Sequence, residues 1–218
     1  MADQSTLDNE VLQSEAEREG LQSWWERAHQ ADHAFWLSGT PGIEVWRCLG
    51  VEELVTPGAS VLNIGVGLGL CTRHLAERDC LVSAMDISPT ALQRVSDVAR
   101  TYLADDMAAL PPRAFDLALS HLVAQHMLDQ DIQAQMEAVI RALKPTGVFA
   151  IQFASWLDDV EDESERSTFD AKRGGMFRTS AKMKDMAARA GGRVLSCAEH
   201  SRYPHYAASW HVIHITPA

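Results

Sequence analysis

The sequence predicts an α/β fold built on one doubly wound, mostly parallel sheet. From residue 59 onward, short apolar runs alternate with helical segments, and the first run, 61–64, leads into a glycine-rich turn. The last two runs, 193–198 and 208–215, are separated by only a short connection. Because parallel neighbours need a long crossover and antiparallel ones do not, these last runs predict an antiparallel pair at one edge of the sheet.

Seven strands are expected in this sheet, with helices on both faces. In chain order the strands are 61–64, 81–85, 102–104, 115–120, 148–154, 193–198 and 208–215. The expected helices are 71–76, 89–98, 132–143 and 180–190, with Ser88 as one N-cap and Thr179 or Ser180 as another. Residues 155–175 are polar and rich in acids, which predicts a solvated loop or a mobile cover.

The N-terminal part has a different, helical pattern. An aromatic-rich helix is expected over 16–37, and a second, short helix over 43–54 after the Ser38–Gly42 break. We therefore expect one globular domain, in which residues 1–55 form a helical cover and residues 56–218 form the core.

Composition and charge narrow the class of function. The 218 residues carry a net charge of −11, which opposes the phosphate neutralisation on which nucleic-acid binding depends. No apolar run approaches the ~20 residues of a membrane span, and no secretory signal is visible, so a cytoplasmic protein without a membrane partner is expected. The four cysteines are scattered and predict free thiols. A small-molecule substrate fits these properties, with the chain a monomer or a homodimer.

The glycine-rich turn contains the strongest signal for a ligand. Gly65, Gly67 and Gly69 follow a buried strand with the spacing G-x-G-x-G, whereas Leu70 occupies the position where a dinucleotide-binding motif needs its third glycine. Asp86 closes the next strand about twenty residues later and could accept both hydroxyls of a ribose, from either an adenosyl cofactor or NAD. The alternative for Asp86 is an ordinary cap of the helix that begins at Pro89.

These residues resemble the class I S-adenosylmethionine-dependent methyltransferases, which have a Rossmann-like fold. Over residues ~59–154 the resemblance continues through the strand 115–121 and the helix–strand junction Leu143–Gly147. It implies S-adenosyl-L-methionine as cofactor and S-adenosyl-L-homocysteine as product. The cofactor-binding residues that it implies are Asn63, Gly65, Gly67, Gly69, Asp86, Ile87, Asp106, Met107 and Ser120. Asn63 departs from the family, which usually has Asp or Glu there, and the amide supplies less electrostatic attraction.

The resemblance also implies the chemistry, an in-line displacement at the sulfonium methyl group. For a hydroxyl acceptor, such as a sugar or a secondary metabolite, a base would help to remove the proton. His121 and His126 follow the fourth strand and are the candidates. Alternatively, His126 packs or caps locally and His121 contributes only its backbone.

The aromatic N-terminal segment is expected to supply lid or acceptor-pocket residues, because aromatic faces suit a sulfonium. The candidates are Trp24, Trp25, His29 and Trp36. Arg178 could meet an anionic substrate or could simply be solvated. No metal site is expected, since His29 and His33 lie one helical turn apart without a third ligand.

Two rival functions stay open. A nicotinamide-dependent short-chain oxidoreductase would share the glycine turn and Asp86, but none of the three tyrosines begins a Tyr-x-x-x-Lys motif. A non-catalytic relative that binds cofactor without turnover is favoured by Asn63.

Overall fold

A computed structural model describes residues 15–31, 40–156, 168–170, 175–203 and 208–218. Its sheet begins with five parallel strands: β1 (Ser60–Ile64), β2 (Leu81–Asp86), β3 (Arg100–Leu103), β4 (Phe115–Ser120) and β5 (Leu143–Trp156). They are arranged in the order β3-β2-β1-β4-β5. β9 (Ala208–Pro217) runs antiparallel to β5, and β8 (Gly192–Tyr203) runs antiparallel to β9. The seven predicted strands and the antiparallel pair are thus confirmed.

Two short strands extend the predicted sheet. β6 (Thr168–Asp170) and β7 (Gly175–Phe177) pair with each other, and Phe177 of β7 is opposite Ala154 of β5. The prediction of a loop throughout 155–175 is therefore wrong for 155–156, 168–170 and 175, because β5 continues to Trp156 along β9, and β6 pairs with β7. The rest of that predicted loop lies outside the described residues.

The fifth strand also begins earlier than predicted. The junction Leu143–Gly147 forms an irregular start of β5, with a register shift between Phe115 and Leu117 of the neighbouring β4. Gly147 is needed there, because a Cβ atom would lie 2.8 Å from the carbonyl oxygen of Phe115.

Six helices are described: α2 (Glu15–Gln30), α3 (Gly42–Cys48), α4 (Leu70–Glu77), α5 (Pro89–Gln93), α6 (Asp129–Ala142) and α7 (Ser180–Arg189). Three short 3₁₀ segments accompany them: η1 (Glu52–Leu54), η2 (Ala104–Ala109) and η3 (Ala124–His126). The side chains of Ser88 and Thr179 cap α5 and α7, as predicted. The expected helix 43–54 is divided into α3 and η1 by Gly50, whose φ is +65°. The expected end of the first helix, 32–37, lies outside the described residues.

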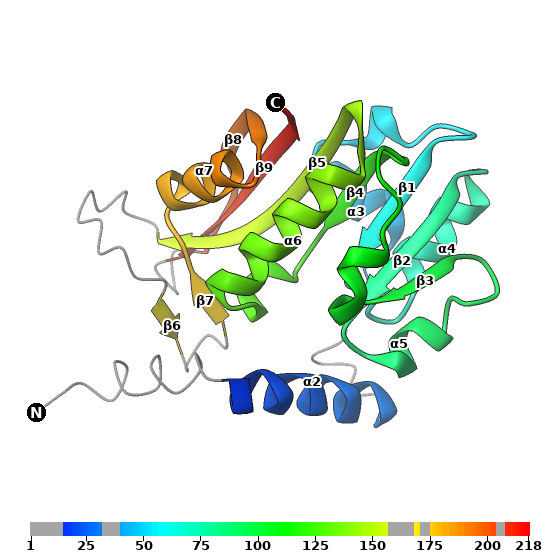
Figure 1. Ribbon diagram of the computed structural model, residues 1–218, viewed down its shortest axis with the longest axis horizontal. Coiled ribbons are helices and arrows are strands. Elements are labelled where there is room, and N and C mark those ends of the chain that lie inside the picture. The colour runs from blue at the N-terminus through cyan, green and yellow to red at the C-terminus, as the bar shows by residue number, and fades with distance from the viewer. Residues whose placement is uncertain (1–14, 32–39, 157–167, 171–174, 204–207) are drawn as a thin grey trace, which may run out of the picture.

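The helices form a layer on each face of the sheet (Figure 1). α3 and α4 pack with Val61, Leu117 and Ala150 on one face, and α5 continues this layer over β2. α6 and α7 cover the other face, where Met183 and Met186 are buried in the core. α2 lies apart from both layers, along one end of the sheet (Figure 1).

Strand register decides which residues meet at the carboxyl end of the sheet. Ile64 of β1 is aligned with Met85 of β2 and with Ser120 of β4. The residues that follow, Gly65, Asp86 and His121, therefore emerge at the same edge. Ligands of open parallel sheets bind at this edge, so these three of the predicted site residues lie where a ligand would be expected.

None of the helices within the described ranges is long and apolar enough to cross a membrane.

Candidate functional site

The turn after β1 requires glycine at several positions. Gly65, Gly67 and Gly69 have φ angles of +79°, +57° and +87°, which side chains with a Cβ rarely adopt. At Gly65 a Cβ atom would lie 2.2 Å from Cγ2 of Val123, and at Gly69 it would lie 2.8 Å from Cγ1 of Val95. The glycines thus allow the turn to pass beneath the loop after β4 and to begin α4 at Leu70.

Asp86 is tied to the glycine turn through backbone N–H groups. Its Oδ2 accepts a hydrogen bond from Val66 N at 2.6 Å, and its Oδ1 accepts one from Ser88 N at 2.9 Å. Burial raises the pKa of this carboxyl, and the N–H groups of Ser88 and Val66, the charge of His29 and the N–H of Gly67 act in the opposite direction. Ser88, not Asp86, is the N-cap of α5. The alternative of Asp86 as the helix cap is therefore wrong.

Asn63 is directed into the core instead of the turn. It is only 4% exposed, and its amide nitrogen donates a hydrogen bond to Oγ1 of Thr72 in α4 at 2.9 Å. This bond ties β1 to α4 beneath the glycine turn. The structure thus gives the unusual amide a structural partner, and its predicted contact with a cofactor stays a prediction.

At the end of β4, one buried polar atom has spare hydrogen-bonding capacity. Ser120 is fully buried, and its Oγ has no hydrogen-bond partner among the described residues. Because an unsatisfied buried hydroxyl is costly, such an atom is typical of a place where a ligand or a water completes the hydrogen bonding. Its position beside the glycine turn agrees with the predicted cofactor contact.

His121 follows Ser120 on a strained piece of backbone. The next residue, Leu122, has a φ of +57°, and its N–H donates to Oε1 of Gln152 at 3.2 Å. Burial, with a smaller contribution from nearby His200, lowers the pKa of His121 to about 4. The imidazole is therefore neutral at pH 7, which is the form that accepts a proton.

Gln152 and His200 were not predicted from the sequence as site residues. Gln152 is only 4% exposed in β5, and its Nε2 donates to Sγ of Cys48 in α3 at 3.2 Å. A glutamine within the apolar run 148–154 is the one signal that could have indicated its role. His200 comes from β8, so only tertiary structure brings it near His121.

His126 packs against the N-terminal helix. Its ring centroid lies 4.9 Å from that of Trp25 at an interplanar angle of 65°, and Nε2 of His126 lies 3.2 Å from Nε2 of Gln125. Burial lowers the pKa of His126 to about 4. These contacts agree with the local packing that was the alternative to its role as a base.

The segment after β3 lies next to Asp86, because Leu103 is aligned with that residue. Here Asp106 is exposed and Met107 is half-buried, and Arg141 of α6 donates to the carbonyl oxygen of Met107 at 3.1 Å. Ile87 is also half-buried. Ile87, Asp106 and Met107, three of the predicted cofactor-binding residues, thus follow two neighbouring strands at the edge where Asp86 lies.

The N-terminal helix α2 provides the predicted lid residues that the structure describes. His29 is 3% exposed, whereas Trp24 is 38% exposed with its ring centroid 4.7 Å from that of Trp25. The carbonyl oxygen of His29 accepts a hydrogen bond from Arg94 at 2.8 Å. Trp36 lies outside the described residues.

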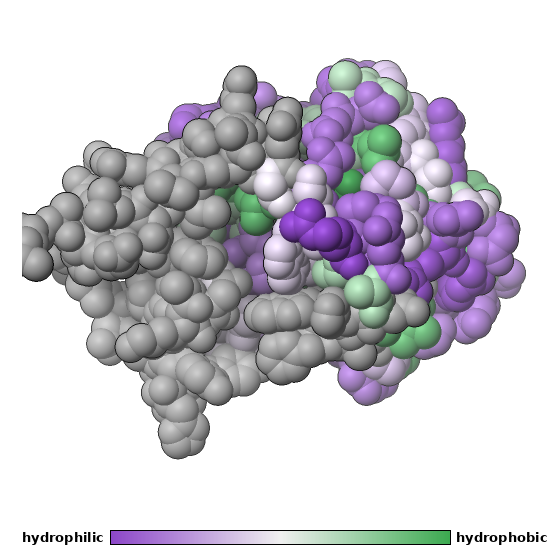
Figure 2. Space-filling view, turned by 90° about the horizontal axis from the view of Figure 1, so that it is seen from below, coloured by the Kyte–Doolittle hydropathy of each residue, from purple (hydrophilic) through white to green (hydrophobic). Residues whose placement is uncertain are grey.

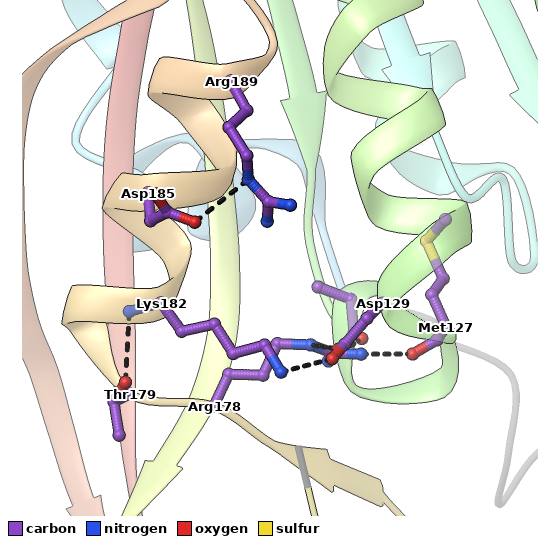
Figure 3. A network of polar contacts seen from close by, with 8 residues as sticks. Met127, Asp129, Arg178, Thr179, Lys182, Asp185 and Arg189 are labelled. Carbon is purple, nitrogen blue, oxygen red and sulfur yellow. Dashed lines mark hydrogen bonds and ion pairs between the residues drawn. The ribbon is translucent and has the colours of Figure 1, made fainter. Parts of the chain in front are cut away.

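Arg178 is a structural residue, contrary to both expectations for it. Its side chain is fully buried, and Nε donates to Oδ1 of Asp129 at 2.8 Å. The other guanidinium nitrogens donate to the carbonyl oxygens of Ala124 and Met127 (Figure 3). Lys182 of α7 also pairs with Asp129. Arg178 is therefore not solvated, and its guanidinium is engaged in holding η3 and α6 against the segment between β7 and α7.

Within the ranges described, no group of three or more His, Cys, Asp or Glu side chains is placed to hold a metal ion.

The fold and this edge define a class of protein, the Rossmann-like α/β proteins with a ligand site at the carboxyl end of the sheet. Residues 61–147 match a family model described as a methyltransferase domain. This part of the chain, which is similar to a methyltransferase domain, includes the glycine turn, Asp86 and Ser120.

Individual relatives are similar over part of their length. The chain is 38% identical over 96 residues to malonyl-[acyl-carrier protein] O-methyltransferase of Salmonella typhimurium, covering 42% of this chain and 38% of the relative. It is 31% identical over 115 residues to 2-methyl-6-phytyl-1,4-hydroquinone methyltransferase of Synechocystis, covering 49% and 35%. The chain thus spans little more than a third of the length of these two relatives.

A solved structure shares the fold over almost the whole chain. The 1,6-didemethyltoxoflavin-N1-methyltransferase of Burkholderia thailandensis, solved with bound 1,6-didemethyltoxoflavin and S-adenosylhomocysteine, has a TM-score of 0.69 at 17% identity. The similarity covers 94% of this chain and 91% of that one. The fold includes the C-terminal strands that lie outside the family match.

Proposed function

We propose that the protein is an S-adenosylmethionine-dependent methyltransferase that acts on a small molecule, with a hydroxyl group as the acceptor. The observation that supports this proposal most is the register of β1, β2 and β4, which brings Gly65, Asp86 and His121 to one edge. The match to a methyltransferase-domain model over 61–147 and the S-adenosylhomocysteine bound in the solved structure of similar fold support it independently.

The residues at this edge fit an adenosyl cofactor. The glycine turn offers close approach to backbone, Asp86 is a buried carboxylate suited to two ribose hydroxyls, and Ser120 Oγ has spare bonding capacity. Ile87 and Met107 offer half-buried apolar side chains for the adenine, and Asp106 an acceptor for its amino group. When bound, S-adenosylmethionine supplies a methyl group on a sulfonium, and S-adenosylhomocysteine is the product.

The chain's own contribution is mainly alignment and the exclusion of water. α2 covers the edge through its contacts with α5 and η3, which reduces access of solvent. A ring nitrogen of His121 takes the proton of the acceptor hydroxyl. Because burial lowers the pKa of His121 to about 4, this base is weak, and its effect belongs near the low end of the ~10²–10⁴-fold typical of general bases.

The choice of a hydroxyl acceptor rests on His121. The names of the relatives cover an O-methyltransferase, a hydroquinone methyltransferase and an N1-methyltransferase, so similarity alone favours no acceptor atom. A net charge of −11 argues against nucleic acid and supports a small molecule, whether a sugar or a secondary metabolite.

The first experiment is calorimetric titration with S-adenosylhomocysteine, S-adenosylmethionine and NAD. We expect the first two to bind and NAD to give no heat of binding. Binding of NAD alone would replace the proposal with the oxidoreductase. Binding of the adenosyl ligands without turnover over a broad acceptor panel would favour the non-catalytic relative, for which Asn63 is the supporting residue.

The role of His121 has a separate test, using an acceptor found in that panel. His121→Ala should reduce turnover about 10²-fold while the affinity for S-adenosylhomocysteine is unchanged. Full turnover in this variant would leave His121 with a backbone role only.

A further inference from the structure

The N-terminal helix α2 bridges two loops that flank the glycine turn. At one end of the bridge, Arg94, just beyond α5, donates to the carbonyl oxygen of His29 at 2.8 Å. At the other, the ring of Trp25 contacts that of His126 in η3 after β4. Since β1 lies between β2 and β4, α2 spans the edge at which the turn after β1 emerges (Figure 1).

Glu26 holds α2 against the loop after β2. Its carboxylate accepts hydrogen bonds from the hydroxyl groups of Ser88 and Thr90 and from the backbone N–H of Thr90 at 3.3 Å. Although desolvation acts to raise it, these bonds lower the pKa of Glu26 to about 2. Glu26 is therefore charged at neutral pH, and its three bonds from Ser88 and Thr90 are charge-assisted. The face of the molecule on the side of α2 is mostly hydrophilic where it is described (Figure 2).

Ser88 connects Glu26 with the predicted ribose carboxylate. The hydroxyl of Ser88 donates to Glu26 and accepts from Ala91 N at 3.1 Å, and the backbone N–H of the same residue donates to Oδ1 of Asp86 at 2.9 Å. One residue thus makes hydrogen bonds to both carboxylates. A displacement of Ser88 that broke the first contact would also disturb the second.

We propose that Glu26 is a positioning residue, which couples the docking of α2 to the binding of the cofactor through Ser88 and Asp86. This inference rests on the proposed function and specifies how the N-terminal helix takes part in it. Coupling is reciprocal: if docked α2 orders Ser88 and Asp86 for the ribose, then a ligand bound at Asp86 must in turn stabilise docked α2.

The test is titration with S-adenosylhomocysteine together with hydrogen exchange of residues 15–30. Glu26→Ala should raise the Kd about tenfold, equivalent to ~1.4 kcal/mol. The ligand should slow exchange in α2 of the unmodified protein and should do so much less in the variant. Glu53→Ala, at an exposed acid in η1, is the matched control and should leave both measurements unchanged.

A second variant separates positioning from a general loss of structure. Thr90→Val removes one hydroxyl donor to Glu26 and keeps the backbone N–H and the side-chain shape. It should raise the Kd in the unmodified background and have little further effect in Glu26→Ala, because both changes remove the same contact. Unchanged exchange in α4 serves as the check on folding.

The outcomes distinguish this inference from the proposed function. Equal Kd values for the unmodified protein and Glu26→Ala, or additive effects of the two substitutions, would overturn the coupling and leave the proposed function intact. Failure of the unmodified protein to bind S-adenosylhomocysteine would overturn both.

Discussion

Two polar clusters in this molecule differ in how completely their hydrogen bonds are satisfied. Around Arg178, the guanidinium meets one carboxylate and two carbonyl oxygens, and Lys182 adds a second cation to Asp129. At the edge formed by β1, β2 and β4, Ser120 Oγ is buried without a partner among the described residues, and Asp86 meets N–H groups of the turns. The first cluster is complete within the chain, and the second has capacity left for a ligand.

How completely the polar groups are hydrogen-bonded distinguishes a structural cluster from a candidate site better than the type of residue does. The sequence placed Arg178 among possible substrate contacts, because a cation before a helix suits an anion. Its complete burial and its partners assign it to packing instead. Conversely, Ser120, which the family resemblance placed among the cofactor-binding residues, has a buried hydroxyl without a partner among the described residues. Substitutions at the two clusters should therefore affect different quantities.

The largest effect is expected at Arg178. Arg178→Met leaves Asp129 and two carbonyl oxygens without their buried donor, and it should lower the free energy of unfolding by about 3–5 kcal/mol. Lys182→Met is the matched control, because this more exposed ion pair to the same Asp129 should contribute only ~0–1 kcal/mol. Urea unfolding measures both. Equal losses would contradict the assignment of the buried Arg178, and not the more exposed Lys182, as the residue that holds this cluster together.

The next effect is expected at Gly65. Gly65→Ala places a methyl group 2.2 Å from Cγ2 of Val123 at a φ of +79°. The left-handed conformation costs ~1–2 kcal/mol and the overlap about 1–3 kcal/mol more, and binding of S-adenosylhomocysteine should be lost with the shape of the turn. Adding Val123→Ala should recover only the stability lost through the overlap, and not the cost of the left-handed conformation. A double variant no more stable than Gly65→Ala would contradict the close approach of the two loops.

Asp86 should affect binding more than stability. Asp86→Asn should weaken the binding of S-adenosylhomocysteine. The free energy of binding should become less favourable by about 1.5–3 kcal/mol, the value of hydrogen bonds to a charged group. The free energy of unfolding should change by about 1 kcal/mol, because relief of the buried charge offsets one lost hydrogen bond. Calorimetry and urea unfolding of the same samples measure the two quantities. Undiminished affinity would refute the ribose role.

At neutral pH, the smallest effect is expected from the two buried histidines. Burial lowers the pKa of His121 and His126 from 6.5 to about 4, so between these values the unfolded chain binds more protons than the folded one. The free energy of unfolding should therefore hardly change above pH 7 and should fall as the pH falls from 6.5 toward 4, by up to about 3 kcal/mol for each histidine. The double variant His121→Asn/His126→Asn should show a shallower slope in urea unfolding. An identical slope would contradict the burial of the two rings.

Prediction from the sequence succeeded where the information is local. The seven strands follow from apolar runs, and the positive φ angles of the turn follow from glycines at 65, 67 and 69. Ser88 was predicted as an N-cap because a serine before proline has few other roles at a helix start. The strands β6 and β7 were missed because three-residue strands exist only through their pairing with β5 and with each other.

The sequence by itself determined the order of the elements, the glycine turn and the position of Asp86 at the end of a buried strand, because backbone preference and hydrophobic periodicity depend on near neighbours. Only the tertiary structure decided that Arg178 is buried, that Gln152 supports the backbone after His121, and that Glu26 meets Ser88. Each of these depends on partners from separate elements, distant by 30 or more residues along the chain. Side chains of the same type can be solvated or buried, and only their distant partners determine which.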